Sequence, residues 1–128
     1  MILNFLKGFK VDNKRKPTNF EEKIKKGIKL HSIRWDRNKR WKKGRKIHFS
    51  TGARTSRYNC FKKGICTGIQ KIEIIDRDII IDNKRCSIDI IEWLSVNDGF
   101  DTINDFWAWF DQYSPFVGVI IHWSELRY

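Results

Sequence analysis

Lysine, serine and arginine side chains occur close together in residues 27–34, GIKLHSIR. An ammonium and a guanidinium bind anionic or polar ligands, and a hydroxyl between them can donate a hydrogen bond to the same ligand. If burial or a neighbouring cation lowers the pKa of Lys29, its amine can also act as a base or nucleophile near neutral pH. The spacing therefore predicts a ligand site at Lys29, Ser32 and Arg34.

A basic arm follows this segment. Residues 37–46 contain seven lysines or arginines in ten positions, with Trp41 among them and Trp35 just before them. Basic side chains can follow a phosphate backbone while an indole stacks on an exposed base. Trp35 is the better stacking candidate, because Trp41 occurs in a turn where we expect it to be at least half buried.

A second basic loop is expected at residues 52–58. Such a loop is often merely solvated, and both interpretations stay open for it. The ligand-binding residues that the sequence predicts are Lys29, Arg34, Trp35, Arg37, Arg40, Trp41, Arg54, Arg57 and Tyr58.

Charge is unevenly distributed along the chain. The formal net charge is +11, yet residues 1–67 contain 21 basic and 4 acidic residues, whereas residues 68–128 contain 5 and 11. A field divided in this way attracts a polyanion to one face. The expected partner is a nucleic acid, RNA rather than DNA, or a nucleoside or nucleotide, ahead of a membrane surface or an acidic protein.

Length and composition predict one folded domain over residues 1–128, with 41% hydrophobic and 14% aromatic residues. No apolar run approaches the roughly 18 residues of a bilayer span, and no signal peptide is recognisable, so we expect a cytoplasmic protein without a membrane partner. Three cysteines without a CxxC pair and three histidines without metal-ligand spacing indicate reduced thiols, no metal site and no cofactor.

The elements that must position the predicted site begin with a strand at residues 2–5 and a mobile basic loop at residues 7–16. A short helix should follow, with Thr18 and Glu21 forming a capping box and Gly27 ending it. Residues 28–34 then predict an irregular strand or extended loop, and residues 46–50 a strand.

The second half of the chain predicts one long strand at residues 64–75, with a register change near its glycine, and a hairpin around residues 82–83. Helices are expected at residues 87–96 and after Thr102, which is a candidate N-cap. Residues 116–123 are apolar almost throughout and should form a central strand. A mixed α+β domain, a small β-barrel with flanking helices, is the simplest packing of these elements.

Three groups of residues resemble the ASCH domain family, whose signature is GxKxxTxR. One is this signature with serine in place of threonine, one is a W-x-x-G turn before a strand, and one is Asp-Gly-Phe leading into an aromatic helix and a closing strand. With the order of elements, the resemblance covers nearly the whole chain. The three groups are Gly27-x-Lys29-x-x-Ser32-x-Arg34, Trp41-x-x-Gly44 and Asp98-Gly99-Phe100.

This resemblance implies a PUA-like fold, a small β-barrel with a cleft, and a role connected with RNA. Some small bacterial ASCH proteins are amidohydrolases that act on N4-acetylcytidine with the signature lysine, its threonine and a later glutamate. Carried over to this chain, the catalytic residues are Lys29, Ser32 and Asp98. Serine lacks the methyl group that restricts the threonine rotamer, and Asp98 is one methylene shorter than glutamate.

Three functions stay open at this point. The first is a nucleic-acid-binding ASCH domain with a ligand cleft, in which Lys29 and Arg34 hold a phosphate or a base edge. The second is an enzyme, an amidohydrolase on an N4-acylated cytidine-type nucleoside or a ribonuclease, in which Lys29 is the base or nucleophile, Ser32 stabilises the oxyanion and Asp98 orients the lysine. The third is an interaction protein that holds an acidic partner.

Overall fold

The largest sheet has five strands in the order β4-β10-β7-β8-β9, in a computed structural model that describes all 128 residues. All neighbouring strands in it are antiparallel. The predicted central strand is confirmed, because β10 pairs with β4 on one side and β7 on the other. The five strands are β4 (His31–Arg34), β7 (Gly68–Ile75), β8 (Asp78–Ile81), β9 (Lys84–Arg85) and β10 (Phe116–His122).

Two smaller sheets complete the β structure. In the three-stranded sheet, β1 lies parallel to β5, and β5 is antiparallel to β6. The third sheet is the β2–β3 hairpin. Their strands are β1 (Ile2–Asn4), β2 (Gly8–Val11), β3 (Lys14–Pro17), β5 (Lys46–Thr51) and β6 (Asn59–Ile65).

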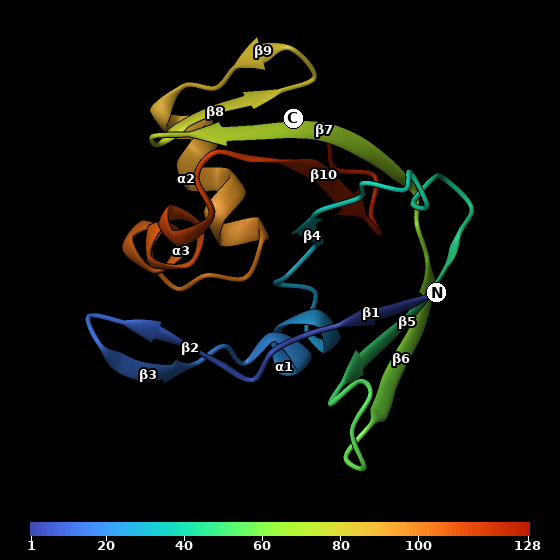
Figure 1. Ribbon diagram of the computed structural model, residues 1–128. Coiled ribbons are helices and arrows are strands. Elements are labelled where there is room, and N and C mark those ends of the chain that lie inside the picture. Colours follow the sequence, from blue (N-terminus) through green and yellow to red (C-terminus); the bar gives the residue numbers. More distant parts are fainter.

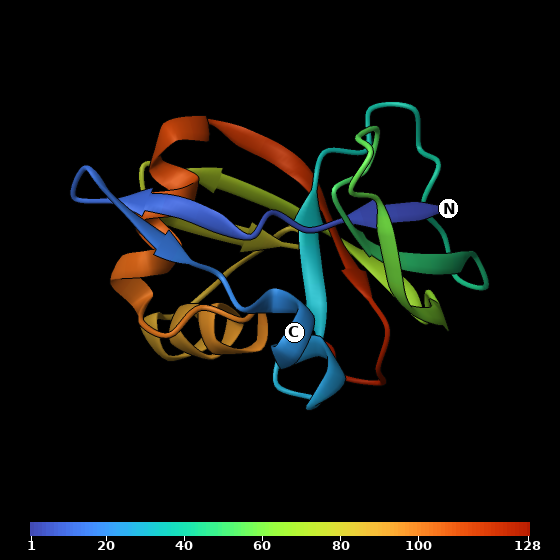
Figure 2. The same cartoon turned by 90° about the horizontal axis from the view of Figure 1, so that it is seen from below.

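Helices fill the space on one face of the large sheet. Figure 1 shows the sheet curving over α2 and α3, with the β2–β3 hairpin on the opposite side of α3. Figure 2 shows the three-stranded sheet at the end of the molecule away from these helices, with β4 and α1 between the two ends. The helices are α1 (Phe20–Lys25), α2 (Ile88–Asn97) and α3 (Ile103–Phe110), followed by the 3₁₀ turn η1 (Asp111–Tyr113).

The prediction of a mobile loop at residues 7–16 is wrong, because these residues form most of the β2–β3 hairpin. Asp12 and Asn13 both have positive φ angles, 51° and 63°, which suit a two-residue hairpin turn. Phe9 is buried, and its ring lies 5.4 Å from that of Trp109. The turn residues and the apolar contacts of Phe9 and Val11 with the core outweigh the high charge of the segment.

The predicted strand at residues 64–75 is divided into two strands that belong to different sheets. At the division, the Cys66 amide donates to the Arg45 carbonyl and the Thr67 amide donates to the His122 carbonyl, at 2.8 and 2.9 Å. The chain therefore leaves the three-stranded sheet and enters the five-stranded sheet at this point. The α+β class is confirmed, whereas the strands form three separate sheets and no closed barrel.

Two of the three expected helix starts are as predicted. Ser87 caps α2, and the Thr102 hydroxyl accepts a hydrogen bond from the Asp105 amide at the start of α3. The prediction of a capping box at the start of α1 is wrong, because Asn19 occupies the N-cap position and its side chain makes no capping hydrogen bond. The Thr18 hydroxyl instead donates to the Leu6 carbonyl at 2.7 Å and ties α1 to the chain after β1.

Aromatic side chains from both halves of the chain form the core between α3, the hairpin and α1. Phe106 and Phe110 of α3 are buried, and Phe100 packs edge-on against Phe20 at 5.7 Å. None of the helices has the length and apolar character needed to cross a membrane.

Candidate functional site

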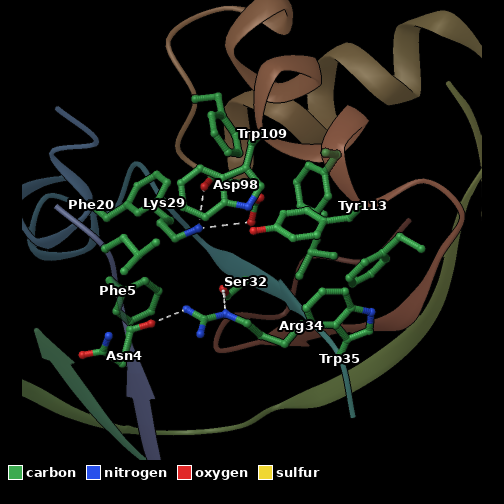
Figure 3. Close-up of a pocket in the computed structure, with 15 residues that line it drawn as sticks. Asn4, Phe5, Phe20, Lys29, Ser32, Arg34, Trp35, Asp98, Trp109 and Tyr113 are labelled. Atoms are coloured by element: carbon green, nitrogen blue, oxygen red, sulfur yellow. Dashed lines mark hydrogen bonds and ion pairs between the residues drawn. The ribbon is translucent and has the colours of Figure 1, made fainter. Parts of the chain in front are cut away.

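A cavity of about 260 Å³ lies where β4 meets the end of α2 (Figure 3). Five residues that the sequence predicts for the site contribute to its wall, and most of the others are apolar or aromatic. The lining residues are Asn4, Phe5, Leu6, Phe20, Lys29, Ser32, Ile33, Arg34, Trp35, Asp98, Phe100, Trp109, Phe110, Tyr113 and Phe116.

Lys29 and Asp98 form a buried ion pair in this wall, with side chains only 2% and 5% exposed. The Lys29 ammonium donates to Oδ1 of Asp98 at 3.1 Å and to the backbone carbonyl of the same residue. It also lies over the Phe20 ring, 4.4 Å from its centroid. Burial lowers the pKa of Lys29 to about 8, although the Asp98 charge opposes this change.

Two glycines bring this pair together. Gly27 has a φ of +74° and ends α1, so that the chain turns towards β4 and brings Lys29 to the cavity. Gly99 has a φ of +95°, and a Cβ atom there would lie 3.0 Å from Cδ of Lys29 and 3.1 Å from the Phe20 ring. Only glycine combines this backbone conformation with room for the lysine side chain.

Ser32 and Arg34 form the second polar group of the cavity. Nε of Arg34 donates to the Ser32 hydroxyl oxygen at 2.9 Å, and Nη2 donates to the Asn4 carbonyl at 2.6 Å. The guanidinium lies 5.1 Å from the centroid of the Phe5 ring. Burial lowers the pKa of Arg34 to about 10, so the side chain remains charged at neutral pH. The Ser32 hydroxyl accepts from Arg34 and donates to no protein group, so its own O–H proton is available to a ligand.

His31 lies behind Asp98 and is fully buried. Its Nδ1 atom is 3.2 Å from Oδ1 of Asp98, and its Nε2 atom is 2.5 Å from the hydroxyl oxygen of Tyr128. The sequence places His31 inside the predicted segment without giving it a role. Tyr128 was missed entirely, because nothing in the sequence connects positions 97 residues apart.

Aromatic rings form the remaining walls. Trp35 is 48% exposed and lies at the rim, with its ring 5.1 Å from Tyr113 and 5.3 Å from Phe116. Sequence reasoning found Trp35 but not Tyr113, Phe20 or Trp109. Their separation along the chain left no signal other than their aromatic character.

The other predicted ligand residues lie outside the cavity. Trp41 is only 8% exposed, which confirms its expected burial, and its ligand-binding role stays a prediction. The remaining five are exposed on the arm and on the loop at residues 52–58, and they are Arg37, Arg40, Arg54, Arg57 and Tyr58. One hydrogen bond joins that loop to the cavity wall, from the Ala53 amide to Oδ1 of Asn4 at 2.9 Å.

No group of three or more histidine, cysteine or acidic side chains is arranged to hold a metal ion. Cys60, Cys66 and Cys86 are unpaired. Comparison of the chain with protein-family models, with curated proteins and with solved structures gives no match.

Proposed function

We propose that this protein binds nucleic acid, RNA rather than DNA, and that the cavity receives one base of the bound strand. The observation that carries the proposal is the convergence of Lys29, Ser32, Arg34 and Asp98 in one cavity with aromatic walls. Its volume of about 260 Å³ is close to the lower end of small-molecule sites, which suits a single base or nucleoside.

The polar groups of the cavity match the edge of a base. Oδ1 of Asp98 accepts from Lys29 and lies near His31, whereas no protein group donates to Oδ2. A free carboxylate oxygen accepts a hydrogen bond from an exocyclic amino group such as N4 of cytosine. Lys29 and the Ser32 hydroxyl are donors for the ring nitrogen and carbonyl oxygen beside it, so a cytosine-like edge meets a complementary set of partners.

Trp35 and the basic surface next to the cavity supply the contacts that a strand requires. Residues 37–63 contain eleven lysines and arginines and no acidic residue. None of these eleven forms an ion pair within the protein, and all but the half-buried Arg45 are exposed. The Ala53 amide joins the loop at residues 52–58 to Asn4 on the cavity wall. Arg54 and Arg57 belong to this loop, so they supply cations for the phosphates that flank a base bound in the cavity.

The relationship to ASCH domains and to PUA-like folds belongs to the same proposal. It is supported by the proximity of Lys29, Ser32 and Asp98, the three positions that the resemblance assigns to one site. Because the strands form three separate sheets, the closed barrel of a PUA-like fold is part of the proposal and is not seen in the strand pairing.

Amide hydrolysis on an N4-acylated cytidine is the second candidate. The observation that favours it is the buried Lys29 amine, whose pKa of about 8 gives it a neutral fraction near physiological pH. Ser32 and Arg34 would stabilise the oxyanion that forms when water attacks the amide carbonyl. A ribonuclease that uses the same three residues, Lys29, Ser32 and Asp98, belongs to this second candidate.

Binding is tested by titrating the protein with cytidine and with short single-stranded RNA, using isothermal calorimetry. Trp35→Leu should weaken RNA binding roughly 5- to 150-fold, since a stacked base contributes about 1 to 3 kcal/mol. Lys29→Met should weaken it as well, because it removes a charged hydrogen-bond donor from the cavity. Trp35→Phe should retain most of the affinity because it keeps an aromatic face. Lys84→Met, which removes an exposed lysine of β9, is the control and should bind as the wild type does. Equal binding by all variants would contradict the proposal.

Hydrolysis is tested by incubating N4-acetylcytidine with wild type and Lys29→Met and separating the products by chromatography. Release of cytidine and acetate by the wild type alone would support the second candidate. Absence of any Lys29-dependent turnover would rule it out and leave the binding proposal untouched.

A further inference from the structure

A buried polar chain leads from the cavity to the segment that follows β10. It starts at Lys29, passes through Asp98 and His31, and ends at the Tyr128 hydroxyl, which also receives a hydrogen bond from Nδ2 of Asn97 at 3.1 Å. Neither the binding proposal nor the hydrolysis proposal uses His31 or Tyr128. A fully buried histidine with partners on both ring nitrogens has one fixed orientation.

The directions of these hydrogen bonds determine the tautomer of His31. An ionised Asp98 carboxylate only accepts, so Nδ1 of His31 carries the proton and donates to Oδ1. Nε2 is then the acceptor, and the Tyr128 hydroxyl donates to it while accepting from Asn97. Burial lowers the pKa of His31, which keeps the ring neutral as this arrangement requires.

Tyr128 is itself held from two sides. Gln70 donates from Nε2 to the Tyr128 carbonyl at 2.9 Å and accepts from the Tyr128 amide at 3.0 Å. The tyrosine ring packs edge-on against Trp93 at 5.1 Å. The hydroxyl is therefore fixed by β7, α2 and β4 together, and it is not a group on a free chain segment.

We propose that His31 and Tyr128 are positioning residues that fix the Asp98 carboxylate, with Oδ1 directed to Lys29 and Oδ2 left free for the ligand. With two donors on Oδ1, rotation of the carboxylate would break two hydrogen bonds at once. The role assigned to Oδ2 rests on the proposed function, whereas the fixed carboxylate and the fixed tautomer do not.

The charged and titratable groups around this chain come from six elements or segments. The turn before β4 contributes Lys29, the end of α2 contributes Asp98, β4 contributes His31 and Arg34, and α1 contributes Lys23. His122 of β10 faces His31 edge-on at 5.4 Å, and burial lowers its pKa to about 3, so it stays neutral. Burial raises the pKa of Tyr128, so its hydroxyl keeps its proton throughout the neutral range.

Tyr128→Phe tests the inference because it removes only the hydroxyl. Two NMR measurements on the protein without ligand are required, the ¹⁵N shifts of the His31 ring and the pH titration of the Lys29 Cε signal. In the wild type, Nδ1 of His31 should be protonated and Nε2 should not. In Tyr128→Phe, His31 loses the partner that holds its ring, Asp98 then accepts mainly from Lys29, and the Lys29 pKa should rise by roughly 0.5 unit or more.

Trp93→Phe is the matched control. It alters packing against the same tyrosine ring and removes no hydrogen bond of the chain, so both NMR signatures should remain those of the wild type. A wild-type His31 protonated on Nε2, or a Lys29 pKa in Tyr128→Phe equal to that of the control, would overturn the inference.

Cytidine titration of the same variants separates this inference from the proposed function. If the wild type binds, Tyr128→Phe should lose severalfold in affinity, and unchanged affinity would refute the role of Oδ2. If the wild type binds neither cytidine nor RNA, the proposed function fails, while the NMR signatures still decide the positioning role.

Discussion

Lys29 has the most unusual environment among the polar residues of the cavity. Its ammonium has one carboxylate partner, Asp98, and two other cations, Arg34 and Lys23, oppose its charge. Desolvation is the largest contribution, and it lowers the pKa of the amine to about 8. At pH 7 the side chain is therefore mainly a charged donor, and at slightly alkaline pH it becomes a neutral base. The two functions proposed for the cavity need these two forms respectively.

The shifted pKa of Lys29 predicts how stability changes with pH. Between about pH 8 and 10.5 the unfolded chain keeps its lysine proton while the folded protein releases it. Stability rises with pH wherever the unfolded state binds more protons, so Lys29 should make the free energy of unfolding increase across this window. Urea denaturation at a series of pH values measures the effect.

Lys29→Met provides the comparison for this experiment, because every other alkaline group titrates in both proteins. The difference in unfolding free energy, wild type minus Lys29→Met, should increase from pH 8 to pH 10.5 and be constant below pH 7. A flat difference over the whole range would mean that Lys29 has an ordinary pKa.

At the level of elements, the site depends on two chain reversals that meet. The turn after α1 delivers Lys29, and the break between α2 and α3 delivers Asp98. The Leu30 amide donates to the Asn97 carbonyl at 2.8 Å and joins the two reversals through the backbone. Both reversals contain a glycine with a positive φ angle, but only Gly99 is in contact with the lysine side chain.

These two glycines form a matched pair for mutation. Gly27→Ala should cost about 1 kcal/mol, since a left-handed backbone is unfavourable for alanine and no atom lies within 4 Å of the new methyl group. Gly99→Ala should cost roughly 2 to 4 kcal/mol, because its methyl group must also displace Lys29 and Phe20. Thermal and urea unfolding measure both values.

Ligand affinity gives a second readout for the same pair. Gly99→Ala should weaken cytidine and RNA binding because it moves Lys29, whereas Gly27→Ala should leave binding close to that of the wild type. Equal effects of the two substitutions on stability and on binding would contradict the role of Gly99 in seating the lysine.

On the scale of the whole molecule, the basic residues of the first half form two groups, those that pair with acidic side chains and those that have no acidic partner. Lys16 and Lys23 pair with Asp101, and Lys16 also pairs with Asp105, so part of the positive charge is neutralised at the helical end. The eleven basic residues at positions 37–63 have no such partners and lie on the arm between β4 and β5, on the three-stranded sheet and on its loops. The three-stranded sheet and its loops lie at the end of the molecule away from α2 and α3 (Figures 1 and 2), so unpaired basic residues gather at that end.

Charge reversal on this basic end should weaken RNA binding in a salt-dependent way. Lys62→Glu, on β6, should reduce affinity and lower the slope of log K against log salt by about 0.7 for each phosphate that the protein no longer neutralises. Lys84→Glu makes the same charge change on β9 and should have a small effect that salt removes. Fluorescence anisotropy with labelled single-stranded RNA at several salt concentrations checks this, and identical slopes for the two variants would argue against a basic binding face.

Local sequence patterns determined the positions of several helices and strands in this protein. Apolar periodicity and capping residues specified α2, α3 and the central strand β10, because caps and periodicity act over a few neighbouring residues. The same holds for Gly27 at the end of α1 and for the position of Lys29, Ser32 and Arg34 in one extended segment. Where the local signals were mixed, as at the Asp12-Asn13 turn of the charged hairpin, the prediction failed.

The resemblance to ASCH domains predicted that Asp98 joins Lys29 and Ser32, whereas only the tertiary structure decided that aromatic residues such as Phe20 and Tyr113 share the cavity with them. Asp98 meets Lys29 across 69 positions, and Tyr128 meets His31 across 97. Such contacts depend on how β4, β10 and α2 pack, and no spacing along the chain encodes them. The turn context of Trp41 already indicated that it is more buried than Trp35, and packing set the extent, 8% exposure against 48%.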